Sequence, residues 1–420
     1  MADKSVEATN IRGSFAYDNW KAALSGASLK SVFEHPLFSD THFSIARDMK
    51  TEFGPYLLYN TQSRGVSHAV PSFILRINYY LDSKMPDLQK TDITRFHGGG
   101  IEDEVAALVS LSLRVRLKAG GMTRLFLTGG SDPKGQPFVP YEGTPTLFKR
   151  QNIYPILPLM MGEHDVSQAK LVDRFADLSP VESIALVRAA RLYQEAIWIA
   201  ESDPQSSWLM LVSAIETAAN HWRAANETAI ERLRTSRPEL AKLLVSVGGQ
   251  KHLSQVADMI ADYMGATRKF LDLLLEFMPD APKPRPRDYD QHSWEPAALK
   301  KSLTTIYRWR SRALHGGTPI PFPMCEPPIP SGDGWSEVMV GYGAGAYGGV
   351  WAAKDAPMKL HLFEYIVHGA LLKWWESMLP PAEAKIQESE KQVAQESAIK
   401  TDPYTKRILN SCFWVALLPC

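Results

Sequence analysis

The stretch SPVESIALVRAARLYQEAIWIA, residues 179–200, marks the point where the chain becomes helical. Ser179 and Glu182 form a capping-box pattern, with Pro180 at the first helical position. Beyond them apolar residues recur at steps of three and four, which predicts a helix with a single buried stripe. The residues of this stripe are Val181, Ala185, Ala189, Leu192, Ala196 and Ile199.

Helical patterns continue toward the C-terminus. A helix from about Pro204 to Trp222 carries one apolar side, formed by Trp208, Leu211, Val212, Ile215, Ala219 and Trp222. Further helices are predicted over about 227–246, 252–278 and 296–315, and a last one with a wide apolar face from Phe363 to Met378. We therefore expect an all-α helical bundle domain over 178–380. Residues 381–420 are expected to form a polar helical tail and a short apolar C-terminus.

The N-terminal part has a different pattern. Phe73, Leu75, Ile77 and Tyr79 alternate with polar residues, which is typical of a strand, and glycine and proline break the chain into short segments. One helix is expected to begin at the acidic turn 102–104 and to give way to a strand near residue 113. The prediction is an α+β domain over 1–160, with a sensing or regulatory role.

Composition bounds the function. The 420 residues carry 46 Lys+Arg and 46 Asp+Glu, and this neutral balance gives no global attraction to nucleic acid or to anionic membranes. The apolar fraction of 45% excludes wholesale disorder. Three cysteines without a CxxC pair exclude a disulfide scaffold and suit a reducing cytoplasm. No signal peptide, membrane span or metal-ligand spacing is evident, so we expect a cytoplasmic protein without membrane partner, metal or cofactor.

The densest group of functional residue types is YRWRSRALHGG, residues 307–317. From Glu295 to His315 there are five Lys/Arg and one acid, a local charge of 5 − 1 = +4. Cations gathered beside a histidine at a helix end suit a phosphate site. The alternative is that basic residues merely complement the helix dipole there.

This stretch resembles the R-S-x-x-x-H-G form of the Rx4–6H motif of HEPN ribonucleases, and more narrowly the ApeA-like HEPN group. Supporting matches are Arg191–Tyr193 with Asp203-Pro204, Leu211–Glu216, Leu362–Tyr365 and Trp374-Trp375. The resemblance covers about 178–380. It implies a metal-independent endoribonuclease of a bacterial anti-phage defence or toxin type. It also implies an RNA substrate, with tRNA as one candidate, a homodimer through the HEPN domain, and a phage or cognate trigger acting through the N-terminal domain.

The resemblance implies catalytic roles for three residues. His315 would transfer protons, Arg310 would hold the phosphate, and Glu216 would pair with the arginine or orient the histidine. Helical geometry places Arg310 and His315 about 140° apart, so we expect the helix to loosen before its end.

The same geometry keeps other residues open as phosphate or substrate contacts. Arg308, Ser311 and Arg312 share the face of His315, and Arg308 also satisfies the motif spacing. Tyr307 is a candidate for stacking on a base, although packing in the core is favoured for it. His221 is expected to be a surface histidine.

Two alternatives stay open. One is a catalytically inactive HEPN module that binds RNA or forms dimers, and the other is a nucleotide-binding regulatory module. The match of 343–350 to G-x-G-x-x-G-x-V lacks the flanking motifs of a kinase or a dinucleotide fold. We predict a glycine-rich hairpin or loop there, acting as a lid near His315.

Overall fold

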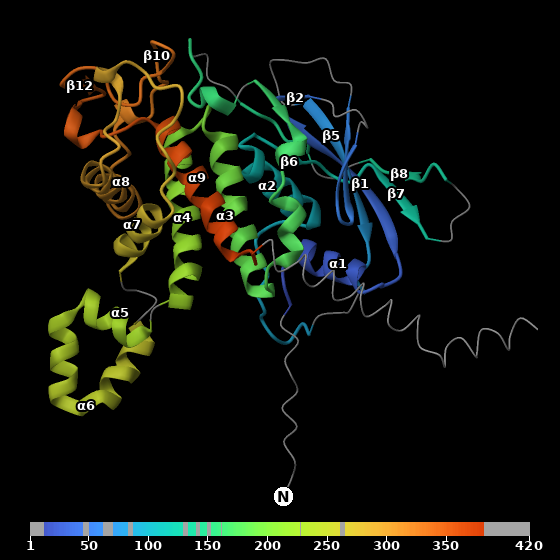
Figure 1. Ribbon diagram of the computed structural model, residues 1–420, viewed down its shortest axis with the longest axis horizontal. Helices are drawn as coiled ribbons and strands as arrows, with labels where there is room; N and C mark the ends of the chain where they lie inside the picture. The colour runs from blue at the N-terminus through green and yellow to red at the C-terminus, as the bar shows by residue number, and fades with distance from the viewer. Residues whose placement is uncertain are drawn as a thin grey trace, which may run out of the picture. The chain divides into compact units, whose positions relative to one another are not determined.

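The structure is a computed structural model (Figure 1). It describes residues 12–44, 50–61, 70–82, 87–128, 133–139, 143–148, 153–160, 162–226, 228–260 and 265–381. Contacts group Met1–Glu376 into one compact unit and Ser377–Cys420 into another. The tail predicted over 381–420 lies outside the described residues from position 382 onward.

An antiparallel sheet fills the N-terminal part of the described chain. Its strands run in the order β3 (Lys50–Phe53), β4 (Tyr56–Asn60), β5 (Val70–Tyr79), β1 (Ser31–Ser39), β7 (Arg124–Leu127) and β8 (Gln136–Pro137), with β6 (Lys118–Ala119) also on β1. A separate parallel pair joins β2 (His42–Ser44) to β9 (Glu163–Asp165). The alternation predicted for β5 is confirmed, because Phe73, Leu75 and Ile77 are buried.

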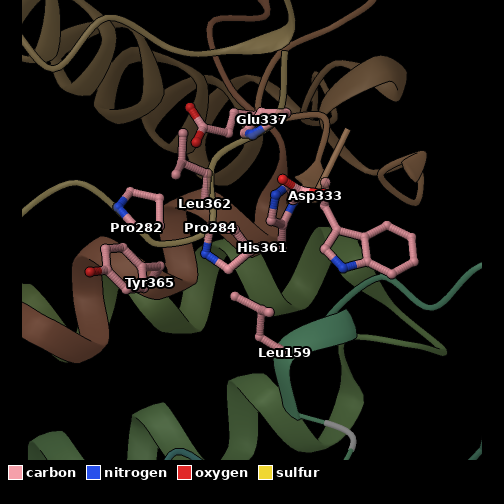
Figure 2. Close-up of a pocket in the computed structure, with 11 residues that line it drawn as sticks. Leu159, Pro282, Pro284, Asp333, Glu337, His361, Leu362 and Tyr365 are labelled. Carbon is pink, nitrogen blue, oxygen red and sulfur yellow. The ribbon is translucent and has the colours of Figure 1, made fainter. Parts of the chain in front are cut away.

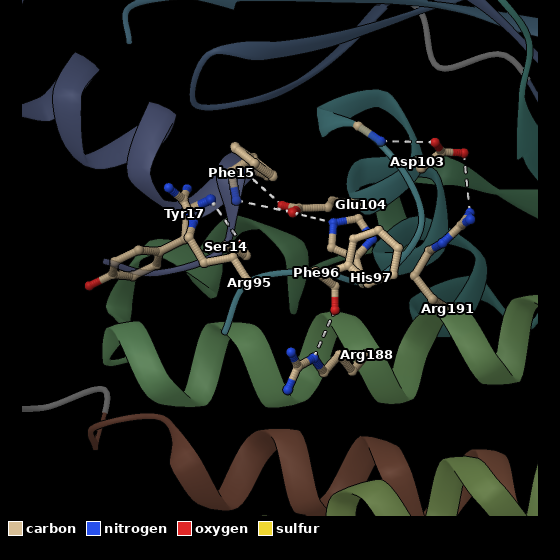
Figure 3. A network of polar contacts seen from close by, with 12 residues as sticks. Ser14, Phe15, Tyr17, Arg95, Phe96, His97, Asp103, Glu104, Arg188 and Arg191 are labelled. Carbon is tan, nitrogen blue, oxygen red and sulfur yellow. Dashed lines mark hydrogen bonds and ion pairs between the residues drawn. The ribbon is translucent and has the colours of Figure 1, made fainter. Parts of the chain in front are cut away.

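Two helices accompany the sheet, α1 (Phe15–Leu24) and α2 (Ile101–Leu113). The second was predicted, including its end near residue 113, but the first was not. Figure 3 shows how they are joined: the Glu104 carboxylate of α2 accepts the backbone N–H groups of Phe15 and Ala16, at 3.0 and 2.6 Å. His97 Nε2 lies 2.7 Å from the same carboxylate. An acid from another helix thus caps the start of α1.

The rest of the described chain is mostly helical, so an α+β region followed by helices is confirmed. The helices are α3 (Pro180–Ile199), α4 (Pro204–Asn226), α5 (Ala229–Ser236), α6 (Pro238–Ile260), α7 (Ala266–Glu276), α8 (Pro296–Gly316) and α9 (Leu360–Met378). Two small hairpins pair β10 (Pro330–Ser331) with β11 (Gly334–Trp335), and β12 (Gly343–Ala346) with β13 (Gly349–Ala352). Short 3-10 turns cover Pro158–Met160, Val166–Gln168, Val172–Asp177, Asp288–Asp290, Phe322–Met324 and Ala353–Asp355.

The predicted helices over 227–246 and 252–278 have the wrong boundaries. Arg237 ends α5, and Pro238 then starts α6 at a first position that tolerates proline. α6 runs through the predicted gap, with a kink at Gly249, where φ is +70°. α5 and α6 bury a small core of their own, formed by Leu233, Ala241, Leu253 and Ala257.

The buried stripe predicted for α3 is also wrong. Val181 is 52% exposed, and of the six predicted residues only Ala189 and Ala196 are buried. α3 lies between α2 and α4 and is covered on more than one side (Figure 1). Polar residues can therefore be buried on it, because they find partners: Gln194 donates to the Leu117 carbonyl, and Tyr193 donates to Glu364 at 2.6 Å.

Two arginines, one fully buried and one mostly buried, join the sheet region to the helices. Arg116 is fully buried and donates to Asp40 at 2.9 Å, to Glu201 at 2.6 Å and to the Ile197 carbonyl at 2.9 Å. Arg114 follows α2 in a left-handed conformation and forms a two-pronged ion pair with Glu364 of α9. Each of the two guanidinium groups is paired with a carboxylate, so we assign both arginines a structural role.

None of the helices within the described ranges is both long enough and apolar enough to cross a membrane.

Candidate functional site

The motif lies on about the last three turns of α8. The helix begins with Pro296 at its first position and continues without interruption to Gly316. Gly317 then ends it in a left-handed conformation, with φ +62°, and its N–H bonds to the Arg312 carbonyl. The expected loosening before Gly316 is therefore wrong, because a glycine C-cap lets the helix stay regular to its end.

Arg310 faces inward, toward α4. Its Nη2 donates to Glu216 Oε2 at 2.6 Å, and Tyr307 donates its hydroxyl to Glu216 Oε1 at 2.7 Å. Both side chains of the Arg310–Glu216 ion pair are about four-fifths buried, with 18% and 19% exposed. The acid–arginine pairing expected between α4 and α8 is thus present.

Tyr307 is a packing residue in this arrangement. It is buried, and its ring lies 5.1 Å from that of Phe270 on α7. Burial raises the pKa of Tyr307, and the hydrogen bond to Glu216 raises it further, so the phenol stays protonated. The side chain is consequently not available to stack on a base.

A second set of motif residues faces solvent. Arg308, Arg312 and His315 are exposed, and Ser311 is half-buried. Arg308 makes a long ion pair with Asp355, at 3.3 Å, while the Arg312 guanidinium lies over the Trp309 ring at 5.0 Å. No carboxylate among the described residues pairs with Arg312.

The six candidate residues on α8 and Glu216 on α4 therefore form two groups. Arg310, Tyr307 and Glu216 are joined on the buried side, and Arg308, Ser311, Arg312 and His315 lie on the other. Arg310 and His315 stay about 140° apart because the helix is intact. Within one chain, His315 and Arg308 or Arg312 can face the same ligand, whereas His315 and Arg310 cannot.

His221 is not a plain surface residue. It is half-buried on α4, its ring lies 5.8 Å from that of Trp374, and its Nδ1 has no partner among the described residues. Burial lowers its pKa, so it is neutral at pH 7.

A small pocket of about 70 Å³ lies between the proline-rich loop 279–288 and the start of α9 (Figure 2). His361 and Tyr365 of α9 face Pro282 and Pro284 there. Burial, together with the positive charges of Arg114 and Lys359, lowers the pKa of His361 to about 3, so this ring is neutral near pH 7. The pocket holds a few water molecules at most, and its histidine is a poor proton donor.

Within the part of the chain that the structure describes, no three His, Cys, Asp or Glu side chains are arranged to hold a metal ion.

Comparison of the chain with protein-family models, with curated proteins and with solved structures found no match. The resemblance to HEPN ribonucleases therefore rests on the motif and on the helices that carry it.

Proposed function

We propose that this chain is an endoribonuclease of the HEPN type. A ribose 2′-hydroxyl would lose its proton and attack the adjacent phosphate, forming a 2′,3′-cyclic phosphate while the bond to the 5′-oxygen of the next nucleotide breaks and that oxygen takes up a proton. The observation that carries the proposal is the Arg310–Glu216 ion pair. It joins the motif helix α8 to the second helix of the bundle in the way that the resemblance implies. Independence from metal ions follows from the same resemblance.

The exposed side of α8 supplies the groups that this chemistry needs. His315 is accessible at the helix end and carries an imidazole, the side chain best suited to proton transfer near neutral pH. Arg312 and Arg308 are accessible cations on the same face and would bind the phosphate and its developing charge. Arg310, held by Glu216, would position the helix and would not touch the RNA within its own chain.

The reaction requires both an acid and a base, and each chain offers one motif histidine. A two-fold homodimer that brings two exposed α8 ends together would supply the second imidazole. The proposal also takes from the resemblance a cytoplasmic defence or toxin role, with the sheet region sensing a phage or cognate trigger.

The test is cleavage of total RNA and tRNA in EDTA by the wild-type chain and by His315→Ala. His252→Ala is the matched control, because His252 is also an exposed histidine on a helix. We expect 2′,3′-cyclic phosphate ends, a loss of about 10²–10⁴-fold in His315→Ala, and unchanged cleavage in the control. Cleavage that survives His315→Ala, or that requires a divalent metal, would contradict the proposal.

A second candidate is an RNA-binding module without nuclease activity. The observation that favours it is the intact helix α8, which keeps Arg310 about 140° from His315, so that one chain cannot bring both motif residues to one phosphate. This alternative predicts that the wild-type chain binds RNA but does not cleave it, either as purified protein or when expressed in growing cells. It further predicts that Arg312→Ala weakens the binding.

A further inference from the structure

The glycine-rich hairpin β12–β13 has an unusual turn. Tyr347 and Gly348 connect the two strands, and both have positive φ, +48° and +78°, as a type I′ turn requires. Asn, Asp or Gly normally fill the first of these positions, because a larger side chain is strained in the left-handed region. A tyrosine at this tip lowers stability, which suggests that it is there for another reason.

The hairpin presents its aromatic side chains to solvent. Tyr347 is 92% exposed at the tip, and Tyr342, just before β12, is 99% exposed. Phe322 touches the Tyr347 ring edge-on, with ring centroids 5.2 Å apart. The more exposed face of the ladder carries only small side chains and one valine: Gly343, Gly345, Val350 and Ala352.

This surface is attached to the exposed end of α8. Asp355 follows β13 and accepts the Trp309 indole N–H through its carbonyl, at 2.7 Å, and the Arg308 guanidinium through its carboxylate, at 3.3 Å. Apart from the paired Arg310, the segments 308–316 and 341–355 contain three cations, Arg308, Arg312 and Lys354, against the single acid Asp355. These contacts place the base of the hairpin beside α8, and they leave Arg312 and Lys354 as the cations that no acid of these two segments balances.

We propose that the hairpin binds single-stranded RNA, with bases stacked on Tyr342 and Tyr347 and phosphates on Arg312 and Lys354. The inference rests on the proposed function and names its substrate class. Exposed aromatic rings next to cations bind unpaired bases in many single-strand binding proteins, since every base has a face to stack. Tyr347 lies five positions after Tyr342, roughly 16 Å along a strand, so the two rings would contact different bases.

The same observations argue against duplex RNA and against a protein partner. Bases in a duplex are stacked on each other and offer no free face to a tyrosine. The face of glycine, alanine and one valine offers little of the well-packed apolar core of a protein interface, and the net positive charge of the two segments favours an anionic ligand.

The test uses the full chain with His315→Ala, so that binding is measured without cleavage. Fluorescence anisotropy measures the affinity for a labelled 12-nucleotide single-stranded RNA. It compares the His315→Ala chain with the same chain that also carries Tyr342→Ala and Tyr347→Asn. Asn suits the turn, so this change does not endanger the fold. Phe138→Ala is the matched control, because Phe138 lies in the sheet region and is 39% exposed.

We expect the double variant to bind about 30-fold or more weakly, with the salt dependence of binding unchanged. Arg312→Ala should instead reduce that salt dependence. The proposal is overturned if the double variant binds as tightly as its parent, if duplex RNA binds as tightly as single-stranded RNA, or if the substitutions change only the dimer equilibrium in sedimentation. A chain that binds in this manner but never cleaves would refute the nuclease and leave this inference standing.

Discussion

Two arginines of this chain, Arg116 and Arg312, lie in opposite environments. Where the sheet meets the helices, Arg116 is fully buried, and two carboxylates and a carbonyl accept its hydrogen bonds. At the end of α8, Arg312 is exposed, and its guanidinium lies over the Trp309 ring, 5.0 Å from the ring centroid. A buried charge must be neutralised to be tolerated, whereas an exposed one needs no partner and stays available to a ligand.

Arg310 stands between these cases. It is mostly buried and paired with Glu216, yet it lies two residues from Arg312 on the same helix. The comparison indicates that spacing in the motif does not determine a residue's role. The side of the helix does, because one side packs on α4 while the other faces solvent.

The largest effect is expected from breaking the buried region. Arg116→Ala leaves Asp40 and Glu201 buried without their cation and should lower the free energy of unfolding by about 3–5 kcal/mol. Urea denaturation measures this. Arg312→Ala, at the exposed end, should change it by less than about 0.5 kcal/mol. Equal effects of the two substitutions would contradict the distinction.

Buried histidines sharpen the comparison through pH. Burial and Arg114 lower the pKa of His361 to about 3 and that of His368 to about 4. The unfolded chain binds these protons near pH 6.5, so their neutral forms stabilise the fold fully above that pH. Each histidine should therefore lower the free energy of unfolding by about 1.4 kcal/mol for every pH unit below 6.5, until the pH reaches its pKa in the folded chain.

Urea denaturation at pH 7.5 and at pH 5.0 measures this effect. The free energy of unfolding should be lower at pH 5.0 by roughly 2 kcal/mol for each histidine. Replacing both histidines with Gln should flatten the dependence. His315→Ala, at the exposed helix end, serves as the control. A slope that persists in the double Gln variant would show that other groups cause it.

The intermediate case should give an intermediate effect. Glu216→Gln keeps a hydrogen-bond acceptor for Tyr307 but removes the charge that pairs with Arg310. Because the pair is partly exposed, a loss of about 1 kcal/mol in unfolding free energy is expected. Thermal unfolding would measure it, and a loss above about 3 kcal/mol would place Arg310 with the fully buried arginines.

The smallest effect is expected at the hairpin tip and has the opposite sign. Tyr347→Asn relieves the left-handed strain and should raise the free energy of unfolding by about 0.5–1 kcal/mol. Tyr342→Ala, at a position with ordinary backbone geometry, should leave stability unchanged. Loss of stability in Tyr347→Asn would mean that the ring is needed for folding.

Local patterns were sufficient for elements whose signals lie within a few residues. The capping box of α3, the glycine end of α8, the apolar face of α9 and the alternation of β5 all follow from such signals. The buried face of α3 could not be predicted in this way, because the buried Tyr193 hydroxyl donates a hydrogen bond to Glu364, 171 residues away in the chain. Arg116 likewise meets Glu201 across 85 residues, a partner that no spacing rule identifies.

The candidate site was predicted in the same uneven way. The pairing of Arg310 with Glu216 was expected from the resemblance. The two faces of the motif followed from helical geometry. The regular end of α8 did not, because loosening was expected where the C-cap at Gly317 keeps the helix intact. The exposed tyrosines of the hairpin gave no signal in the sequence beyond the glycines around them.

The central claim is that RNA binds where α8 ends and the β12–β13 hairpin begins. Photocrosslinking of a 4-thiouridine-labelled single-stranded RNA to the full His315→Ala chain, with mass spectrometry of the linked peptides, tests it directly. We expect crosslinks within 308–316 and 341–355, lost when Tyr342 and Tyr347 are replaced. Crosslinks confined to the sheet region, with none in these two segments, would contradict the account.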